Sequence, residues 1–374
     1  MDELALATRL MAYDTSRPEG VRVAAEFVRG WLEERGIPVR TLDHGGLPVL
    51  IAQVGAAEGP DVILHGHLDV VPAFDHQFNP VLDGDRLVGR GAYDMKGGLA
   101  AMLFALVDAA AQDAVRVRLV CVPDEESEDV DSRSTDVLVA DGTLTADFAI
   151  TGEPTDLHIG IQAKGVLALR LEVTGTAAHG STPWLGDNAI LKAHDAFRRI
   201  ETLPFSRESS DLFDRPSINL ARINGGDAFN KVPDRCAIDV DIRYLPGQDA
   251  EAIRAQIEAL ADVTIVRSFH RPPALVERTN PYVLALRDAV SRSLEGEALS
   301  IGRDGASDAI AFLEAGIPAV EFGPVGGGHH GPEEWVSAQS LVRYRRALGD
   351  FIALLPSRLG IAGVQAPRLR AVEG

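Results

Sequence analysis

Imidazole and carboxylate side chains occur where short apolar or glycine-rich runs of this sequence end. The residues concerned are His67 and Asp69 after DVIL, Asp94 within GRGAYDMKGG, Glu125 and Glu126 after RLVCVP, Glu153 after DFAIT, and His330 after VEFGP. The glycines around Asp94 let the backbone approach a ligand closely, and a helix is predicted to begin just after it. Because open α/β sheets place their ligand sites at strand ends, we expect these side chains to meet.

A mixture of imidazole and carboxylate groups is typical of zinc sites, and cobalt or manganese can substitute for zinc. Two histidines, two terminal carboxylates and one shared carboxylate would hold two ions about 3.5–4 Å apart with a water between them. In the adjacent pair Glu125 and Glu126, one carboxylate can bind metal while the other accepts the proton of that water. The pattern therefore predicts a hydrolytic metal site.

The elements that must position these residues alternate between strand and helix. The apolar runs VLIAQVG, DVILHGHLD and VRVRLVCVP alternate with predicted helices at residues 19–35 and from about residue 96, which is typical of a mostly parallel sheet covered on both faces. After ADFAITGEPT, alternating patterns such as VLALRLEVTG and CAIDVDIRYLPG, with helical stretches near 188–200 and 250–261, indicate an α+β segment. Beyond RPPALVE the first pattern resumes, with a helix near 282–294 and the strand PAVEFG.

We therefore predict an α/β fold in which one domain is inserted into another. The chain of 374 residues exceeds the usual size of a single hydrophobic core. The predicted catalytic domain comprises residues 1–164 and 274–374, and the smaller α+β domain comprises residues 165–273.

Composition limits the partners of this chain. Lys and Arg number 36 against 55 Asp and Glu, and the net charge of -19 disfavours binding to nucleic acid or to anionic membranes. The acidic N-terminal segment does not resemble a secretory signal, and no apolar run reaches the roughly 18 residues of a membrane span, so we expect a cytoplasmic protein. Cys121 and Cys236 are expected to be buried free thiols.

Five ordered motifs resemble those of the M20 metallopeptidases and deacylases, a family that includes acetylornithine deacetylase, succinyl-diaminopimelate desuccinylase and glutamate carboxypeptidase. They are GHLDVVP, GRGAYDMKGG, PDEES, TGEPT and HHGPEEWV, and the resemblance covers nearly the whole chain. It implies a metal-binding catalytic domain with a central, mostly parallel sheet and an inserted lid or dimerisation domain. The chain departs from the family after the acid pair, where SEDVDSRST stands in place of the usual nearby glycine.

The resemblance also implies roles for the residues of these motifs. Each subunit would bind two Zn²⁺ ions. The ligands of one ion would be His67 and Glu153, those of the other would be Glu126 and His330, and Asp94 would bind both. Asp69 would orient His67 and so determine its tautomer. Glu125 would act as the general base.

Two further histidines lie beside the implied ligands. His65 is two residues before His67 and would point to the same side of an extended strand, but the motif match favours His67. We expect His65 to form a hydrogen bond at the strand end. The step of four residues from His330 to Glu334 fits the family pattern, so His329 is not expected to be a ligand.

Three residues of the middle segment match the family's inserted domain. The resemblance implies a homodimer formed through this domain, in which His179 from the partner subunit stabilises the oxyanion of the tetrahedral intermediate. Asn230 would polarise the region of the scissile carbonyl, and Arg243 would hold the substrate's carboxylate. The alternative for Arg243 is a surface ion pair with Asp239 or Asp241.

The expected reaction is hydrolysis of the amide bond of an N-acyl amino acid, a small-molecule substrate. Glu125 would take the proton of the metal-activated water and pass it to the leaving amine, while metal and His179 stabilise the oxyanion. Arg243 and the backbone N–H groups of Gly327 and Gly328 would hold the carboxylate.

Other functions are left open by the sequence. A dipeptidase or a glutamate-type carboxypeptidase would use the same metal-binding residues. A family member without catalysis could be a binding or scaffold protein, and a metal-dependent phosphoesterase is a more distant alternative. The segment GASDA, at residues 305–309, resembles a substrate loop of the family.

Overall fold

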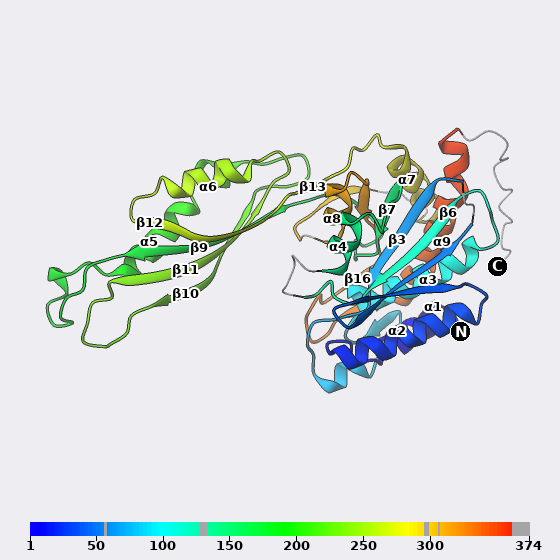
Figure 1. Ribbon diagram of the computed structural model, residues 1–374, viewed down its shortest axis with the longest axis horizontal. Helices are drawn as coiled ribbons and strands as arrows, with labels where there is room; N and C mark the ends of the chain where they lie inside the picture. The colour runs from blue at the N-terminus through cyan, green and yellow to red at the C-terminus, as the bar shows by residue number, and fades with distance from the viewer. Residues whose placement is uncertain (56–57, 128–132, 295–298, 306, 361–374) are drawn as a thin grey trace. The chain divides into compact units, whose positions relative to one another are not determined.

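The computed structural model describes residues 1–55, 58–127, 133–294, 299–305 and 307–360 (Figure 1). The chain divides into two compact units. The first consists of Met1–Ile161, Val276–Ile301 and Ser307–Gly374, and the second of Gln162–Leu275 and Gly302–Ala306. The predicted insertion at residues 165–273 falls within the second unit, and its role as a lid or dimerisation domain stays a prediction.

A mixed sheet forms the centre of the first unit. Its strand order is β1-β2-β6-β3-β7-β15-β8-β13, and β14 pairs with β8. By residue number, β13 and parts of β8 and β14 belong to the second unit. The strands are β1 (Val39–His44), β2 (Leu47–Val54), β3 (Asp61–His67), β6 (Arg116–Val122), β7 (Phe148–Thr151), β8 (Ile159–Ala163), β13 (Ala274–Leu275), β14 (Ser300–Arg303) and β15 (Ala319–Glu321). The central strands β6, β3, β7 and β15 run parallel, which confirms the predicted α/β fold with a mostly parallel sheet.

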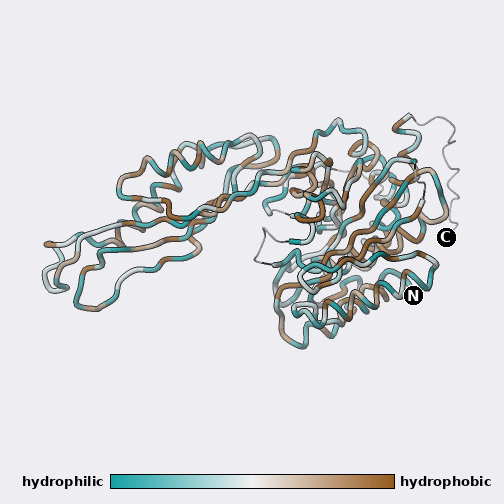
Figure 2. Tube along the Cα trace, viewed as in Figure 1, coloured by the Kyte–Doolittle hydropathy of each residue, from teal (hydrophilic) through white to brown (hydrophobic). Residues whose placement is uncertain are grey.

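Helices cover both faces of this sheet (Figure 1). The helices are α1 (Glu3–Met11), α2 (Pro18–Glu33), α3 (Gly97–Ala109), α4 (Ser134–Ala140), α7 (Pro281–Leu294), α8 (Ala309–Glu314) and α9 (Ala338–Arg358). On one face, Leu138 of α4 and Phe312 of α8 pack on Ile63 and Val120. On the other, Phe148 of β7 stacks on Tyr282 of α7 and meets Phe351 of α9 at a tilted angle. Strands covered on both faces are apolar along their length, as the hydropathy colouring shows for the central sheet (Figure 2).

A small antiparallel sheet joins two distant parts of the first unit. It consists of β16 (Gly326–Gly327), β17 (Trp335–Ser337), β5 (Arg86–Val88) and β4 (Val81–Asp83), in that order. Because β17 pairs with β5, the turn that carries His330 lies beside the segment that carries Asp94. Short helical turns complete the described chain, namely η1 (Asp75–Phe78), η2 (Ala92–Lys96), η4 (Pro183–Leu185) and η5 (Pro204–Arg207).

The second unit is a four-stranded antiparallel sheet with two helices on one face. Its strands follow the order β10 (Ser217–Gly225), β11 (Arg235–Tyr244), β9 (Gly165–Thr174) and β12 (Val263–Arg271), and its helices are α5 (Ala189–Ile200) and α6 (Ala250–Glu258). In β11, buried residues alternate with more exposed ones, so Ile238, Val240 and Ile242 enter the core under the helices. This alternation is the pattern that predicted an α+β segment.

The cysteines and the apolar character of the helices were both considered from the sequence. Cys121 and Cys236 are both free and buried, as expected. Among the described residues, none of the helices has the length and apolar character needed to cross a bilayer.

Two valines on α2 provide a test of the packing of the first unit. Val28 is fully buried, whereas Val23 on the same helix is 54% exposed. We expect Val28→Ala to lower the free energy of unfolding by about 2 kcal/mol, since it removes buried methyl groups and leaves a cavity. The same change at Val23 should alter it by less than about 0.5 kcal/mol. Urea unfolding followed by circular dichroism measures both, and equal losses would contradict this packing.

Candidate metal centre

The predicted ligands meet at one edge of the central sheet because three parallel strands end there. His67 is the last residue of β3 and lies in register with Val122, the last residue of β6. The acid pair follows β6, and Glu153 follows β7, which runs parallel to β3 on its other side. The carboxyl ends of neighbouring parallel strands therefore bring these side chains to the same place.

Asp94 lies at the centre of the cluster. Its Oδ1 is 2.9 Å from Nε2 of His67, and its Oδ2 is 3.1 Å from Nε2 of His330 and 2.5 Å from Nε2 of His329. His330 Nε2 is also 3.0 Å from Oε1 of Glu126. Two groups of ligand atoms, each within 4.8 Å, contain this aspartate: Asp94 with His329 and His330, and Asp94 with His67 and Glu126. A carboxylate that faces a different imidazole with each oxygen is suited to bridge two ions.

The charges in the cluster stabilise one another. Burial opposes ionisation of Asp94, but hydrogen bonds from His329, His330 and His67 outweigh it and hold the pKa of this carboxyl well below its usual range. Hydrogen bonds to Asp94 and Glu126 raise the pKa of His330 to about 10. The carboxylates of the site are thus compensated by positive charge on the imidazoles, and a bound cation would supply the same compensation.

Glu153 stands slightly apart from the other predicted ligands. Its Oε1 lies 3.9 Å from Nε2 of His67, and it belongs to neither of the two groups of ligand atoms. Glu126, by contrast, lies close both to His330 and to the group that contains His67. The structure thus brings all five predicted ligands together, while their division between two ions stays a prediction.

Asp69 holds both the first histidine and the acid pair. His67 Nδ1 donates to the backbone oxygen of Asp69 at 3.0 Å and lies 3.4 Å from its Oδ1, which leaves Nε2 of the ring to face Asp94. The carboxylate of Asp69 accepts the backbone N–H groups of Glu125 at 3.2 Å and Glu126 at 2.8 Å. One side chain therefore orients the imidazole of a predicted ligand and the loop that carries the acid pair.

The carboxyl of Glu125 is set up to bind a proton. Burial is the main cause that raises its pKa well above the usual value, and the nearby carboxylates of Asp308 and Glu153 add to it. His67 and Arg133 oppose the shift, and Arg133 Nη1 donates to Oε1 of Glu125 at 3.0 Å. A carboxyl with a raised pKa that remains paired with a cation can both accept and release a proton.

A buried polar network lies behind Glu125. Thr135 donates to Asp308, whose second oxygen is 3.8 Å from Nη1 of Arg133. His65 Nε2 is 2.9 Å from the hydroxyl of Thr135 and 3.3 Å from Asp308, which confirms that His65 forms a hydrogen bond at the strand end. Burial lowers the pKa of His65 to about 4, so this ring is neutral near pH 7.

Neither Arg133 nor this role of Asp308 was predicted from the sequence. Asp308 belongs to GASDA, where the structure shows it buried in this network. In the same segment, Ser307 donates to Glu321 at 2.7 Å. The departure from the family after the acid pair falls largely on residues 128–132, which lie outside the described residues.

Arg90 and Glu334 connect the two distant segments that carry Asp94 and His330. Glu334 is fully buried, and its Oε1 accepts the backbone N–H groups of Tyr93 at 2.9 Å and Asp94 at 3.0 Å. Arg90 binds the other oxygen of Glu334 at 2.5 Å and donates to the backbone oxygen of His330 at 3.0 Å. The pair therefore fixes Asp94 relative to His330. Neither residue was predicted to function, although both lie inside the motifs GRGAYD and HHGPEE.

The turn that carries His330 has an uncommon backbone conformation. His330 has φ of +58°, which for a residue other than glycine costs roughly 1–2 kcal/mol. Gly328 has φ of +74°, and a Cβ there would lie 2.6 Å from the backbone oxygen of Glu333. Gly327 pairs with Trp335 in the small sheet. The binding of a substrate carboxylate by Gly327 and Gly328 stays a prediction.

The remaining predicted residues belong to the second unit. His179 and Asn230 lie side by side there, since Gly180 N–H donates to the backbone oxygen of Asn230 at 2.7 Å. Nδ1 of His179 accepts the backbone N–H of Ser181 at 3.2 Å, so the neutral ring carries its proton on Nε2. Arg243 contacts both oxygens of Asp241 through Nε at 3.1 Å, which is one of the two ion pairs considered as an alternative. Roles for these residues at the metal centre stay predictions.

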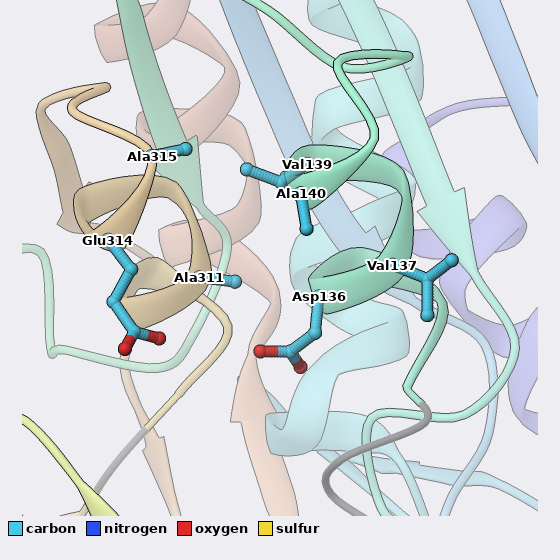
Figure 3. A pocket seen from close by; sticks show the side chains of 7 residues that line it. All are labelled: Asp136, Val137, Val139, Ala140, Ala311, Glu314 and Ala315. Carbon is cyan, nitrogen blue, oxygen red and sulfur yellow. The ribbon is translucent and has the colours of Figure 1, made fainter.

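A pocket of about 530 Å³ between α4 and α8 lies outside this centre (Figure 3). Asp136 and Glu314 stand at its edge, and Val137, Val139 and three alanines line the rest. None of the predicted ligands lines this pocket, so it is not the metal site.

The donor set fits a divalent ion. Imidazole nitrogens and carboxylate oxygens are the groups that zinc binds in hydrolytic enzymes, and cobalt and manganese accept the same ligands. These donors come from segments as far apart as His67 and His330 and still lie within a few ångströms of Asp94.

The fold and this cluster are those of a metallopeptidase or amidohydrolase. The family model described as peptidase family M20/M25/M40 matches residues 63–354, and the chain belongs to this family of enzymes.

Among curated relatives, a probable succinyl-diaminopimelate desuccinylase of Staphylococcus aureus (strain N315) is 27% identical over 343 residues, which cover 79% of this chain and 83% of the relative. A probable carboxypeptidase of Aspergillus terreus is 32% identical over 266 residues, which cover 65% of this chain and 60% of that protein. Among solved structures, an M20 family metallo-carboxypeptidase from Sulfolobus solfataricus matches with a TM-score of 0.77 and 20% identity, over 96% of this chain and 100% of that chain. This structural match supports the fold.

The Arg90–Glu334 pair leads to a prediction about metal affinity. We expect Arg90→Met to weaken zinc binding by about 10–100-fold, since the groups that orient metal ligands contribute this much and the buried carboxylate of Glu334 loses its cation. Arg345→Met is the matched control, because Arg345 pairs with Asp108 and Glu3, which are not among the predicted ligands. Competition with a chromophoric chelator measures both affinities, and equal affinities would show that the pair does not position the site.

Proposed function

We propose that this enzyme is a two-metal hydrolase that cleaves the amide bond of N-acyl amino acids. The observation that carries the proposal is the position of Asp94, which faces His67 with one oxygen and His330 with the other, while Glu125 lies next to the ligand Glu126. The similarity to a protein named as a probable desuccinylase supports an acylated amine as the substrate.

The residues proposed to hold two zinc ions are His67, Asp94, Glu126, Glu153 and His330. Ions bound there would lower the pKa of a water molecule and polarise the amide carbonyl. Asp69 keeps the ring of His67 in the tautomer that presents Nε2 to the site. Arg90 and Glu334 hold Asp94 and His330 at a fixed separation.

Glu125 carries the proton transfer in this proposal. Its raised pKa lets it accept a proton from the attacking water and then give that proton to the leaving amine. Arg133 holds the carboxylate through Oε1, and the other oxygen would take the proton. The carboxyl of Glu125 would therefore serve as the base in the first step and as the acid in the second.

The second unit would supply the remaining groups. His179 is exposed, and its Nε2, which carries the proton of the neutral ring, can donate to an oxyanion. Asn230, which lies beside it, would polarise the carbonyl region. Arg243 uses Nε for Asp241, and its two terminal nitrogens would bind the substrate's carboxylate together with the N–H groups of Gly327 and Gly328.

A dipeptidase or carboxypeptidase activity is the second candidate, supported by the relative named as a probable carboxypeptidase. The same metal-binding residues would serve both reactions. Turnover of N-acetyl and N-succinyl amino acids by the zinc-loaded and cobalt-loaded enzyme, compared with turnover of dipeptides, separates the two. Faster hydrolysis of dipeptides would replace the first proposal by the second.

The adjacent acids provide a matched test of the base. We expect Glu125→Gln to keep both ions and to lower kcat by about 100-fold or more, as for loss of a general base. Glu126→Gln, the same change one residue further along, should instead lose an ion. Elemental analysis of metal content and steady-state kinetics measure these effects. A Glu125→Gln variant that binds fewer ions would make Glu125 a ligand.

A mixing experiment tests whether His179 acts across a homodimer. We expect His179→Ala to lower kcat by about 100–1,000-fold with metal content unchanged, the range for an oxyanion donor. Mixing it with Glu125→Gln should partly restore activity, because a heterodimer would contain one site with both an intact Glu125 and an intact His179. Each variant alone, treated in the same way, is the control. Demonstrated subunit exchange without recovered activity would contradict donation across the dimer.

A further inference from the structure

His329 is an imidazole of the cluster that the proposed function does not use. Its Nε2 lies 2.5 Å from Oδ2 of Asp94, the oxygen that also faces His330. The ligand atoms of Asp94, His329 and His330 all lie within 4.8 Å of one another. His329 therefore stands as close to the shared carboxylate as the residues proposed to bind metal.

The backbone of the turn explains how two adjacent histidines reach one oxygen. Consecutive side chains of an extended chain point to opposite sides. Here φ of +58° at His330 and a turn closed by the bond from Gly331 N–H to the oxygen of Gly328, at 2.7 Å, bring both rings to the same side. The ring centroids of His329 and His330 are 4.4 Å apart. Strained backbone of this kind is found where a site requires it.

Contacts around the turn hold this arrangement. Arg90 donates to the backbone oxygen of His330 at 3.0 Å, within the strained segment itself. Tyr93 meets the ring of His329 edge to face, with 6.1 Å between the ring centroids. Each of these contacts limits the ways in which the two imidazoles could turn away from Asp94.

We propose that His329 is an additional metal ligand, which binds the same ion as His330 and gives that ion a second imidazole beside the carboxylates of Asp94 and Glu126. This inference rests on the proposed two-metal site. A second imidazole strengthens the hold on that ion and favours zinc and cobalt over manganese, which prefers oxygen ligands. The two ions would then differ in affinity and in ligand set.

The alternative role for His329 is a hydrogen bond to Asp94 without contact to metal. Two substitutions separate these roles. His329→Ala removes both, whereas His329→Gln keeps an N–H donor for Asp94 but lacks the imidazole. His76→Ala is the control, because His76 is an exposed histidine of the first unit that belongs to neither group of ligand atoms.

The experiment measures stepwise zinc binding by the full-length chain, and the visible absorption of the same variants loaded with Co²⁺. We expect both His329 variants to bind one of the two ions on the order of 100-fold more weakly, while the other ion is retained. The Co²⁺ absorption of the weakened site should change, because it reports the number and type of ligands. The control should match the unchanged protein in both measurements.

Three other results would each contradict the ligand role of His329 in a different way. Wild-type affinity and an unchanged Co²⁺ spectrum in His329→Gln would overturn the ligand role and assign a hydrogen bond, while the two-metal proposal would stand. Unchanged binding in both variants would exclude either role for His329. An unsubstituted protein that takes up fewer than two ions would overturn the proposed function together with this inference.

Discussion

Three carboxylates lie around the ring of His67, those of Asp94, Glu126 and Glu153. The carboxyl of Glu125 is a fourth, next to them. Carboxylates this close to one another in a largely buried space repel, so they stay ionised together only when cations lie among them. The imidazoles of His329, His330 and His67 give part of this compensation, and their hydrogen bonds hold the pKa of Asp94 low. Divalent ions would provide the rest. The need for positive charge at this edge of the sheet is the constraint on which the surrounding structure depends.

The scaffold around this cluster keeps the charges from moving apart. The parallel strands β3, β6 and β7 end at the same edge of the sheet. Their ends therefore determine the positions of His67, the acid pair and Glu153. The small sheet of β16, β17, β5 and β4 brings the turn of His330 to the same edge. Within that frame, Glu334 receives two backbone N–H groups of the Asp94 segment and binds Arg90, which in turn holds His330. A buried ion pair that aligns two segments contributes more to their geometry than to net stability.

A second polar network controls the candidate base. Arg133 lies between Glu125 and Asp308, and Thr135 connects Asp308 to His65. Burial raises the pKa of Glu125 and lowers that of His65, so the first favours a bound proton and the second stays neutral. The carboxyl of Glu125 thus lies between the guanidinium of Arg133 on one side and the carboxylates of the candidate metal site on the other. Such a position lets one side chain exchange a proton in both directions.

The order and local pattern of the residues were enough to predict the α/β fold and the candidate ligands that the structure brings together near Asp94. Apolar runs that end in His67, Glu126 or Glu153 indicate parallel strands, and parallel strands bring their carboxyl ends to one edge whatever the loops between them do. The partners of those ligands could not be predicted in this way. Arg90 and Glu334 are 244 residues apart, Thr135 and Asp308 are 173 residues apart, and no sequence spacing relates them. The proximity of His329 to Asp94 depends on one positive φ angle at His330, whereas the spacing to Glu334 alone pointed only to His330. Sequence by itself determined the strands and the candidate ligands at their ends, because periodicity and strand ends are local. The tertiary structure alone decided which groups hold them there, because those contacts depend on packing between distant segments.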